Sequence, residues 1–177
     1  GSVDDFLRLH GVTGIQAVDT RAITRRVREH GTLLCVMGRA DDERELKRRL
    51  EVLKAPDLED LVDEVSIDQP VLLNPGFRGP RLAALDCGIK YNILRELCRR
   101  FEVLWCPPDI SLDVLVNEWG IEAMFASNGP GDPAHPGKAT NARRTLAAAV
   151  ASGMPSMGIC LGHQLLGLAS GLTTYKM

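Results

Sequence analysis

Apolar residues near the start of the chain recur at helical spacing. A stretch that begins at Asp19 or Thr20 carries Ile23 and Val27 on one face and stops before Gly31. An acidic or hydroxyl side chain at the start and a glycine just past the end are residues that commonly cap helices. The pattern therefore predicts one helix between these two caps.

The rest of the first half mixes strand and helix signals. Residues 32–37 (TLLCVM) form a short apolar run typical of a strand. Leucines at i, i+4 and i+7 in residues 41–53 predict a charged helix, and a short acidic helix is expected over 57–64. Prolines and glycines then crowd residues 68–80, so we expect no regular element there and place a domain boundary near Arg78.

Beyond this boundary, apolar strands and helical segments alternate. Strands are expected over 81–85, 102–106, 122–126 and 155–159, and helices over 90–100, 111–119, 140–151 and 161–169. Such alternation is typical of a parallel sheet with helices on both faces. The predicted fold class is α/β, a doubly wound, flavodoxin-like parallel sheet in residues 79–177, preceded by part of a smaller α+β domain and its linker in residues 1–78.

Composition and charge exclude several classes of protein. The chain carries 21 basic and 23 acidic side chains, a formal net charge of −2, which favours neither nucleic acid nor an anionic membrane as partner. No apolar run reaches the ~20 residues that a membrane-spanning helix needs. The five cysteines are odd in number, lack CxxC spacing and have no histidine at ligand spacing, so neither a disulfide framework nor a metal site is expected. Reduced thiols suit a cytoplasmic protein.

One motif with chemical potential is GICLGHQ, residues 158–164. Cys160 follows a predicted strand and precedes a predicted helix, with Gly158 and Gly162 two positions to either side. This is the arrangement of a nucleophile elbow with sulfur in place of oxygen. The helix N-terminus favours the reactive thiolate, and the N–H of Leu161, unpaired in the first turn, can donate to an oxyanion. We therefore predict a nucleophile at Cys160 rather than a small residue buried at a strand end.

A second motif, SNGPGDP, occupies residues 127–133 after another predicted strand. Its prolines and glycines are typical of a plain connecting loop, which is the competing interpretation. Ligands of such sheets bind beyond the carboxyl ends of the strands, where this loop and Cys160 both lie. We therefore expect the loop to face the substrate, with the N–H of Gly129 joining that of Leu161 in an oxyanion hole.

The two motifs together resemble the class I, triad-type glutamine amidotransferases, and in detail the small subunits of carbamoyl phosphate synthetases. Three further stretches carry the likeness, GIQAVDTRAITR at 14–25, DCGIKYNILR at 86–95 and GHQLLGLASG at 162–171. The likeness runs from about residue 6 to the last residue. A GxCxG motif alone is shared by many hydrolases, whereas all five stretches together are specific.

The resemblance implies a glutamine-hydrolysing subunit. Cys160 would attack the side-chain amide of L-glutamine to form a thioester, with the oxyanion held by the backbones of Gly129 and Leu161. Gly129, Gly131, Leu161 and Gln164 would contact bound glutamine. The ammonia would pass to a large synthetase subunit in a heterodimer. That partner uses ATP, Mg and bicarbonate to make carbamoyl phosphate for arginine and pyrimidine synthesis, whereas this chain needs no cofactor or metal of its own.

The family's catalytic triad also needs a histidine and a glutamate, which the resemblance places beyond Met177. Residues 79–177 would then be only the first part of the amidotransferase domain. Because proton transfer contributes ~10²–10⁴-fold to such reactions, the chain alone is expected to be nearly inactive. His163, three residues past Cys160 in the first helical turn, is not expected to replace the missing base.

Two alternative functions stay open. One is another class I glutaminase, such as those that serve anthranilate, GMP or CTP synthesis, although the first 75 residues fit these less well. The other is a non-catalytic scaffold of the same fold, against which the thiol at Cys160 argues. A flavodoxin-like binding domain is disfavoured, because the turn at Asp86, Cys87 and Gly88 is short and acidic where a phosphate loop would lie.

Overall fold

The computed structural model describes residues 1–55 and 58–175. Its backbone divides into two compact units, one formed by Gly1–Leu53 and the other beginning at Lys54. The second unit thus starts earlier than the boundary predicted near Arg78.

The segment before Arg78 belongs to the second unit because its polar groups bond there. The side chain of Asn74 donates to the carbonyl of Phe101 at 2.8 Å and accepts the N–H of Val103 at 2.9 Å. The prolines and glycines of this segment therefore interrupt regular structure within the second unit.

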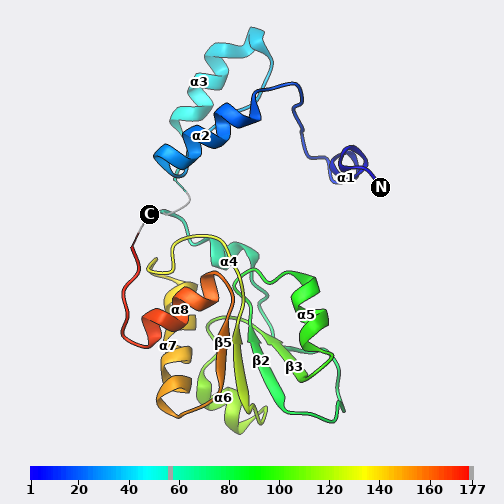
Figure 1. The fold of residues 1–177 in the computed structure, drawn as a ribbon, viewed down its shortest axis with the longest axis vertical. Coiled ribbons are helices and arrows are strands. Elements are labelled where there is room, and N and C mark those ends of the chain that lie inside the picture. Colours follow the sequence, from blue (N-terminus) through cyan, green and yellow to red (C-terminus); the bar gives the residue numbers. More distant parts are fainter. Residues whose placement is uncertain (56–57, 176–177) are drawn as a thin grey trace. The chain divides into compact units, whose positions relative to one another are not determined.

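Short helices make up the first unit (Figure 1): α1 (Val3–Leu9), α2 (Thr20–His30), the 3-10 turn η1 (Ala40–Asp42) and α3 (Glu43–Glu51). The helix predicted after Asp19 is confirmed, because this carboxylate accepts the N–H of Ala22 at 2.9 Å and Gly31 ends α2 with a φ of 75°. The pattern did not predict α1, which begins with a capping box between Ser2 and Asp5. No residue of α1, α2 or α3 is buried.

The strand predicted over 32–37 is wrong. These residues have no regular secondary structure, and Leu33 and Leu34 remain 43% and 41% exposed. A strand needs a hydrogen-bonded neighbour, and the part of the first unit that the structure describes contains no second strand. The apolar run alone could not supply that neighbour.

A five-stranded sheet in the order β1-β3-β2-β4-β5 forms the centre of the second unit. Its strands are β1 (Val71–Leu72), β2 (Arg81–Leu85), β3 (Glu102–Cys106), β4 (Ala123–Ala126) and β5 (Ser156–Gly158). The strands β3, β2, β4 and β5 are parallel, which confirms the predicted fold class, and β1 pairs antiparallel with β3 at one edge. The two-residue β1 corrects the expectation of no regular element over 68–80, since proline is tolerated beside an edge strand.

Helices precede, connect and follow these strands, close to where they were predicted. They are α4 (Leu61–Val65), α5 (Tyr91–Leu97), α6 (Leu112–Asn117), α7 (Lys138–Ala151) and α8 (Leu161–Ala169). Ser111 caps α6, its hydroxyl accepting the N–H of Val114 at 3.3 Å. The helix α4 coincides with the end of the acidic helix predicted over 57–64, and Asp57 lies outside the described residues.

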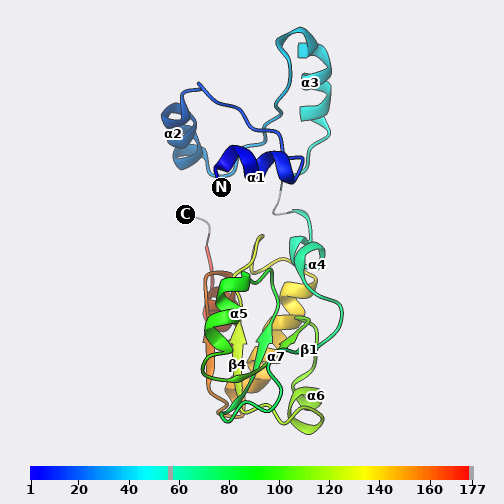
Figure 2. The same ribbon diagram turned by 90° about the vertical axis from the view of Figure 1, so that its right-hand side faces the viewer.

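Side chains alternate between the two faces of the sheet and build a core on each. Ala83 and Leu85 of β2 join one cluster, which is covered by α6, α7 and α8, whereas Leu82 and Ala84 join the other, which is covered by α5. Figure 2 shows α5 and α7 on opposite sides of the strands. Both faces are thus buried, as a doubly wound sheet requires.

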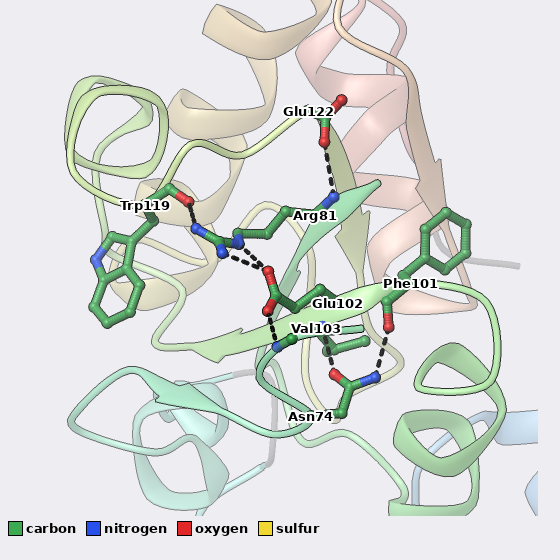
Figure 3. Close-up of polar contacts among 8 residues, drawn as sticks. Asn74, Arg81, Phe101, Glu102, Val103, Trp119 and Glu122 are labelled. Atoms are coloured by element: carbon green, nitrogen blue, oxygen red, sulfur yellow. Dashed lines mark hydrogen bonds and ion pairs between the residues drawn. The ribbon is translucent and has the colours of Figure 1, made fainter. Parts of the chain in front are cut away.

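At the amino ends of β2 and β3, a partly buried ion pair joins the two strands (Figure 3). The guanidinium of Arg81 binds the carboxylate of Glu102 and donates to the carbonyl of Trp119. The N–H of Gly76, and then Arg81, hold the pKa of Glu102 below its usual range. These contacts lie at the opposite end of the strands from Cys160, so their role is structural.

Across residues 1–55 and 58–175, no helix combines the length and apolar character needed to cross a membrane.

Candidate active site

Cys160 lies on a strained turn between β5 and α8. Its φ and ψ are 52° and −112°. Among the described residues only Ala17 and Cys160 have a positive φ without being glycine. Such a conformation costs ~1–3 kcal/mol and persists only where the surroundings impose it. The thiol is exposed, so the predicted elbow geometry is present and presents sulfur at the surface.

The two flanking glycines make this turn sterically feasible. A Cβ on Gly158 would collide with the backbone of Gly162, and a Cβ on Gly162 would collide with the carbonyls of Ala126 and Ser127. The backbone of the turn therefore crosses directly over the end of β4. Any larger residue at either position would push Cys160 away from the neighbouring strand.

The predicted loop after β4 lies beside the elbow. Strands β4 and β5 are parallel neighbours, so their carboxyl ends meet at one edge of the sheet. The N–H of Gly162 donates to the carbonyl of Ser127 at 2.9 Å. A Cβ on Gly129 would lie 2.7 Å from the side chain of Leu161. The structure thus brings together the two residues whose backbones were predicted to form the oxyanion hole.

Both candidate oxyanion donors are available to a ligand. Within the part of the chain that the structure describes, the N–H groups of Gly129 and Leu161 have no hydrogen-bond acceptor. Leu161 itself is buried, and it opens α8, whose N-terminus carries partial positive charge. Two free backbone donors beside an exposed thiol are the groups that acyl transfer requires.

The remaining predicted contacts border the same edge. Gly131 has a φ of 84°, a conformation that glycine adopts without strain, and it is exposed in the loop. Gln164 is exposed in the first turn of α8, and its N–H donates to the carbonyl of Cys160 at 3.1 Å. The backbone of Gly131 and the side chain of Gln164 are therefore accessible to a ligand at this edge of the sheet.

The histidines do not complete a triad in the described chain. His163 is exposed on α8, and no hydrogen bond joins it to Cys160. His10 and His30 belong to the first unit, and His135 lies in the loop before α7. Across the described residues, no group of three or more histidine, cysteine, aspartate or glutamate side chains could hold a metal ion.

Cys160 is exposed, whereas Cys87 and Cys106 are buried and Cys98 is partly buried. Burial, and then the Asp86 charge, raise the pKa of Cys87 to about 12, and the same causes raise the pKa of Cys106. Burial also raises the pKa of Cys98. The raised pKa values of Cys87 and Cys106 disfavour the thiolate, which is the nucleophilic form, at these two buried positions.

Pattern reasoning missed a buried carboxylate that shapes the site. Asp86, only 1% exposed, accepts the N–H groups of Ile67, Gly88 and Ile89 at 3.1, 2.9 and 2.9 Å. It therefore holds the turn after β2, which touches the loop at Pro130. An aspartate two residues before a glycine at a strand end is a known turn signal, and it could have revealed this role.

The helix α4 packs beside the loop after β4, a contact that the sequence did not predict. A Cβ on Gly131 would lie 3.9 Å from Leu61, and Asp60 accepts the N–H of Lys138 at 2.9 Å. The ammonium of Lys138 binds Asp63 at 2.8 Å, and this contact raises the pKa of Lys138. The start of α7 and the loop before it are thereby tied to α4.

Two family models match the sequence. The model "Glutamine amidotransferase class-I" matches residues 83–177, which is more than half of the chain. The chain belongs to this family. The model "Carbamoyl-phosphate synthase small chain, CPSase domain" matches residues 1–37, in the first unit. The family match covers β3, β4, β5 and the Cys160 elbow, and it agrees with the parallel sheet described above.

Curated relatives extend over nearly all of this family member. The chain is 42% identical to a "Carbamoyl phosphate synthase small chain" of Nitratidesulfovibrio vulgaris (strain Miyazaki F), covering 99% of the chain and 50% of the relative. It is 38% identical to the small chain of Methanopyrus kandleri, covering 99% and 48%. It is also 38% identical to "Multifunctional protein CAD" of Squalus acanthias, covering 99% and 7%. The chain thus spans about half the length of the small chains that it matches.

Proposed function

We propose that this chain is part of the glutaminase subunit of a carbamoyl phosphate synthetase. The observation that carries the proposal is the exposed thiol of Cys160 on a strained turn, beside the free N–H groups of Gly129 and Leu161. Membership of the class I glutamine amidotransferases supports glutamine as the substrate. The match of residues 1–37 to the carbamoyl-phosphate synthase small chain supports this synthetase over other class I glutaminases. Those alternatives would account for the second unit but not for the first.

In the proposed reaction, the Sγ atom of Cys160 attacks the side-chain amide carbon of glutamine. The carbonyl oxygen gains the negative charge and is held by the N–H groups of Gly129 and Leu161. The carbon–nitrogen bond breaks, and nitrogen leaves as ammonia with a proton that a general base has carried. Water then cleaves the thioester, which releases glutamate and restores the thiol.

The same proposal covers the parts of the reaction outside this chain. The proposal draws the general base from outside the described residues, since no hydrogen bond joins a described histidine to Cys160. Ammonia passes to a large synthetase subunit, which uses ATP, Mg and bicarbonate to make carbamoyl phosphate for arginine and pyrimidine synthesis. The pairing is a heterodimer in the cytoplasm, and the five free cysteines suit that reducing compartment.

The decisive experiment uses the full-length protein with its synthetase partner and measures glutamate release and Cys160 labelling by an alkylating glutamine analogue. We expect Cys160→Ser to lower glutamine hydrolysis by at least ~10³-fold and to abolish labelling. Synthesis from added ammonia should be unchanged, because it bypasses the thiol. Cys35→Ser is the matched control, since Cys35 is also exposed but lies in the first unit. Hydrolysis that survives Cys160→Ser would refute Cys160 as the nucleophile, and a wild-type protein that is not labelled at Cys160 would favour the non-catalytic scaffold.

A further inference from the structure

The N–H of Gly129 shares a peptide unit with the carbonyl of Asn128. A peptide unit is planar and trans, so its C=O and N–H point in opposite directions and turn together. The hydroxyl of Ser127 donates a hydrogen bond to the carbonyl of Asn128 at 2.7 Å. The group that holds this carbonyl therefore also sets the direction of the Gly129 N–H.

The hydroxyl of Ser127 is itself firmly held. Ser127 is 0% exposed, and its Oγ accepts the N–H of Cys87 at 2.9 Å. Its own N–H donates to the carbonyl of Leu85 at 3.2 Å, and its carbonyl accepts the N–H of Gly162. These bonds tie Ser127 to β2, to the turn after β2 and to the start of α8. Because Oγ is already an acceptor from Cys87, the hydroxyl proton is directed to the carbonyl of Asn128.

A second contact braces the same loop from its other side. The side chain of Asn128 donates to the carbonyl of Gly88 at 2.9 Å and accepts the N–H of Lys90 at 3.4 Å. This contact fixes the Asn128 side chain, whereas Ser127 fixes its peptide carbonyl. The two residues thus hold different parts of one short segment.

Glycine at position 129 creates the need for such a lock. A Cβ there would collide with the carbonyl of Cys87, so no larger residue fits. Glycine also adopts both signs of φ with little penalty, so rotation of the peptide unit before it costs little. In the proposed oxyanion site, a rotation by half a turn would remove the N–H of Gly129 and put a carbonyl oxygen in its place. A carbonyl oxygen there would repel the oxyanion.

We propose that Ser127 is a positioning residue for the oxyanion site, whose buried hydroxyl locks the peptide unit between Asn128 and Gly129 with its N–H toward the reacting carbonyl. The inference rests on the proposed glutaminase function. A hydrogen bond to the carbonyl also polarises the peptide unit and strengthens its N–H as a donor. Ser127 therefore acts on the transition state through Gly129, without touching the substrate.

The test compares Ser127→Ala with the wild type in the full-length protein assembled with its partner. Loss of one oxyanion donor costs ~10²–10³-fold in rate, and an unlocked donor is lost for part of the time, so we expect kcat for glutamine hydrolysis to fall ~10–100-fold. The KM for glutamine should stay within ~3-fold, because the lock matters most when charge develops on the oxygen.

Two further readouts separate positioning from a purely structural role. The γ-aldehyde analogue of glutamine adds the thiol to form a tetrahedral oxyanion, so its inhibition constant should rise in parallel with the loss of kcat. Iodoacetamide alkylates Cys160 by displacement at a saturated carbon, with no oxyanion, so its rate should stay within ~3-fold. A lowered kcat with an unchanged inhibition constant for the aldehyde, or with equally slowed alkylation, would overturn the inference.

Ser156→Ala is the matched control. The Ser156 hydroxyl also donates to a backbone carbonyl, that of Met154 at 3.0 Å, but it lies at the start of β5, away from the elbow. We expect this variant to keep the wild-type kcat. Equal kcat values for Ser127→Ala and Ser156→Ala would contradict the proposed lock.

Ser127→Cys tests the inference if Ser127→Ala fails to fold. The activity of the wild type shows whether the proposed function itself holds. If Ser127→Ala does not assemble with the partner, Ser127→Cys keeps a weak donor of similar size and should show an intermediate loss of kcat, ~3–30-fold. A Ser127→Cys variant with unchanged kcat would sink the inference. A wild-type protein that releases no glutamate would instead refute the proposed function, whatever the variants do.

Discussion

The two units of this chain are stabilised in different ways. In the first unit the described interactions are local, such as the carboxylate of Glu45 that binds Arg48 and Arg49 within α3. In the second unit Leu85 and Leu104 are fully buried, and Phe125 is 2% exposed. Local interactions of exposed charges contribute only tenths of a kcal/mol each, whereas buried side chains contribute ~1.5–3 kcal/mol. The candidate site belongs to the unit with the core, where long-range packing can hold a strained turn.

The largest contrast is expected at glycines. Gly162→Ala should stop glutamine hydrolysis almost completely, by more than ~10²-fold, because its Cβ would meet the backbone of β4 next to the oxyanion donors. Helix propensity alone would favour alanine there by ~1 kcal/mol, so a loss of activity shows that the collision decides. The matched control is Gly11→Ala in the first unit, where nothing lies within 4 Å of the added Cβ and the φ of 63° strains only the turn after α1. Equal effects of the two variants on hydrolysis would break the contrast.

The next contrast is expected at leucines. Leu104→Ala removes a fully buried side chain from β3 and should lower the free energy of unfolding by ~2–5 kcal/mol. Leu50→Ala changes a residue of α3 that is 40% exposed and should cost less than ~1 kcal/mol. Urea unfolding of the full chain measures both values. Similar losses of unfolding free energy for the two variants would show that the first unit has a hydrophobic core, contrary to the exposed fractions of its side chains.

Removing a helix cap should lower the free energy of unfolding by similar amounts in both units, but the effect should spread further in the second unit. Asp19→Ala and Ser111→Ala each remove one side-chain cap and should cost ~1 kcal/mol. In the first unit we expect faster hydrogen exchange confined to α2, since none of its residues is buried. In the second unit Ser111→Ala should lower the midpoint of the whole cooperative transition. Exchange that spreads beyond α2 in Asp19→Ala would argue against this difference.

The smallest contrast concerns pH. The N–H of Gly76, and then Arg81, lower the pKa of Glu102 below its ordinary value of 4.5. Its ionised form therefore adds stability that is present above pH 4.5 and is lost as pH falls through the lower folded pKa. Between about pH 5 and 3, Tm should fall more steeply for the wild type than for Glu102→Gln.

Glu45→Gln in α3 provides the comparison for this pH effect. Hydrogen bonds from Arg48, and then Arg49, also lower the pKa of Glu45, but this side chain is 40% exposed whereas that of Glu102 is 8% exposed. Screening by solvent should leave the pH dependence of Glu45→Gln close to that of the wild type. An equal change for both variants would show that burial does not matter here.

The features that were predicted correctly depend on residues close together in the sequence. Asp19 and Ser111 cap helices as expected, and the parallel strands β2 to β5 follow from apolar runs between helical segments. The Cys160 elbow was predictable because glycines at fixed spacing around a strand-to-helix turn constrain the backbone locally. Elements that depend on a distant partner were predicted wrongly, including the strand over 32–37, or were missed, as β1 was.

The amino-acid sequence by itself therefore determined the caps of α2 and α6, the order of the elements from β2 to α8 and the thiol at the elbow, since each depends on neighbours a few positions away. Only the tertiary structure decided that Asp86 also binds the N–H of Ile67 and that Ser127 holds the peptide unit before Gly129. The hydrogen bond to Ser127 spans 40 positions, from the N–H of Cys87. No local pattern encodes such a contact, because it exists only once parallel strands have brought their carboxyl ends to one edge of the sheet.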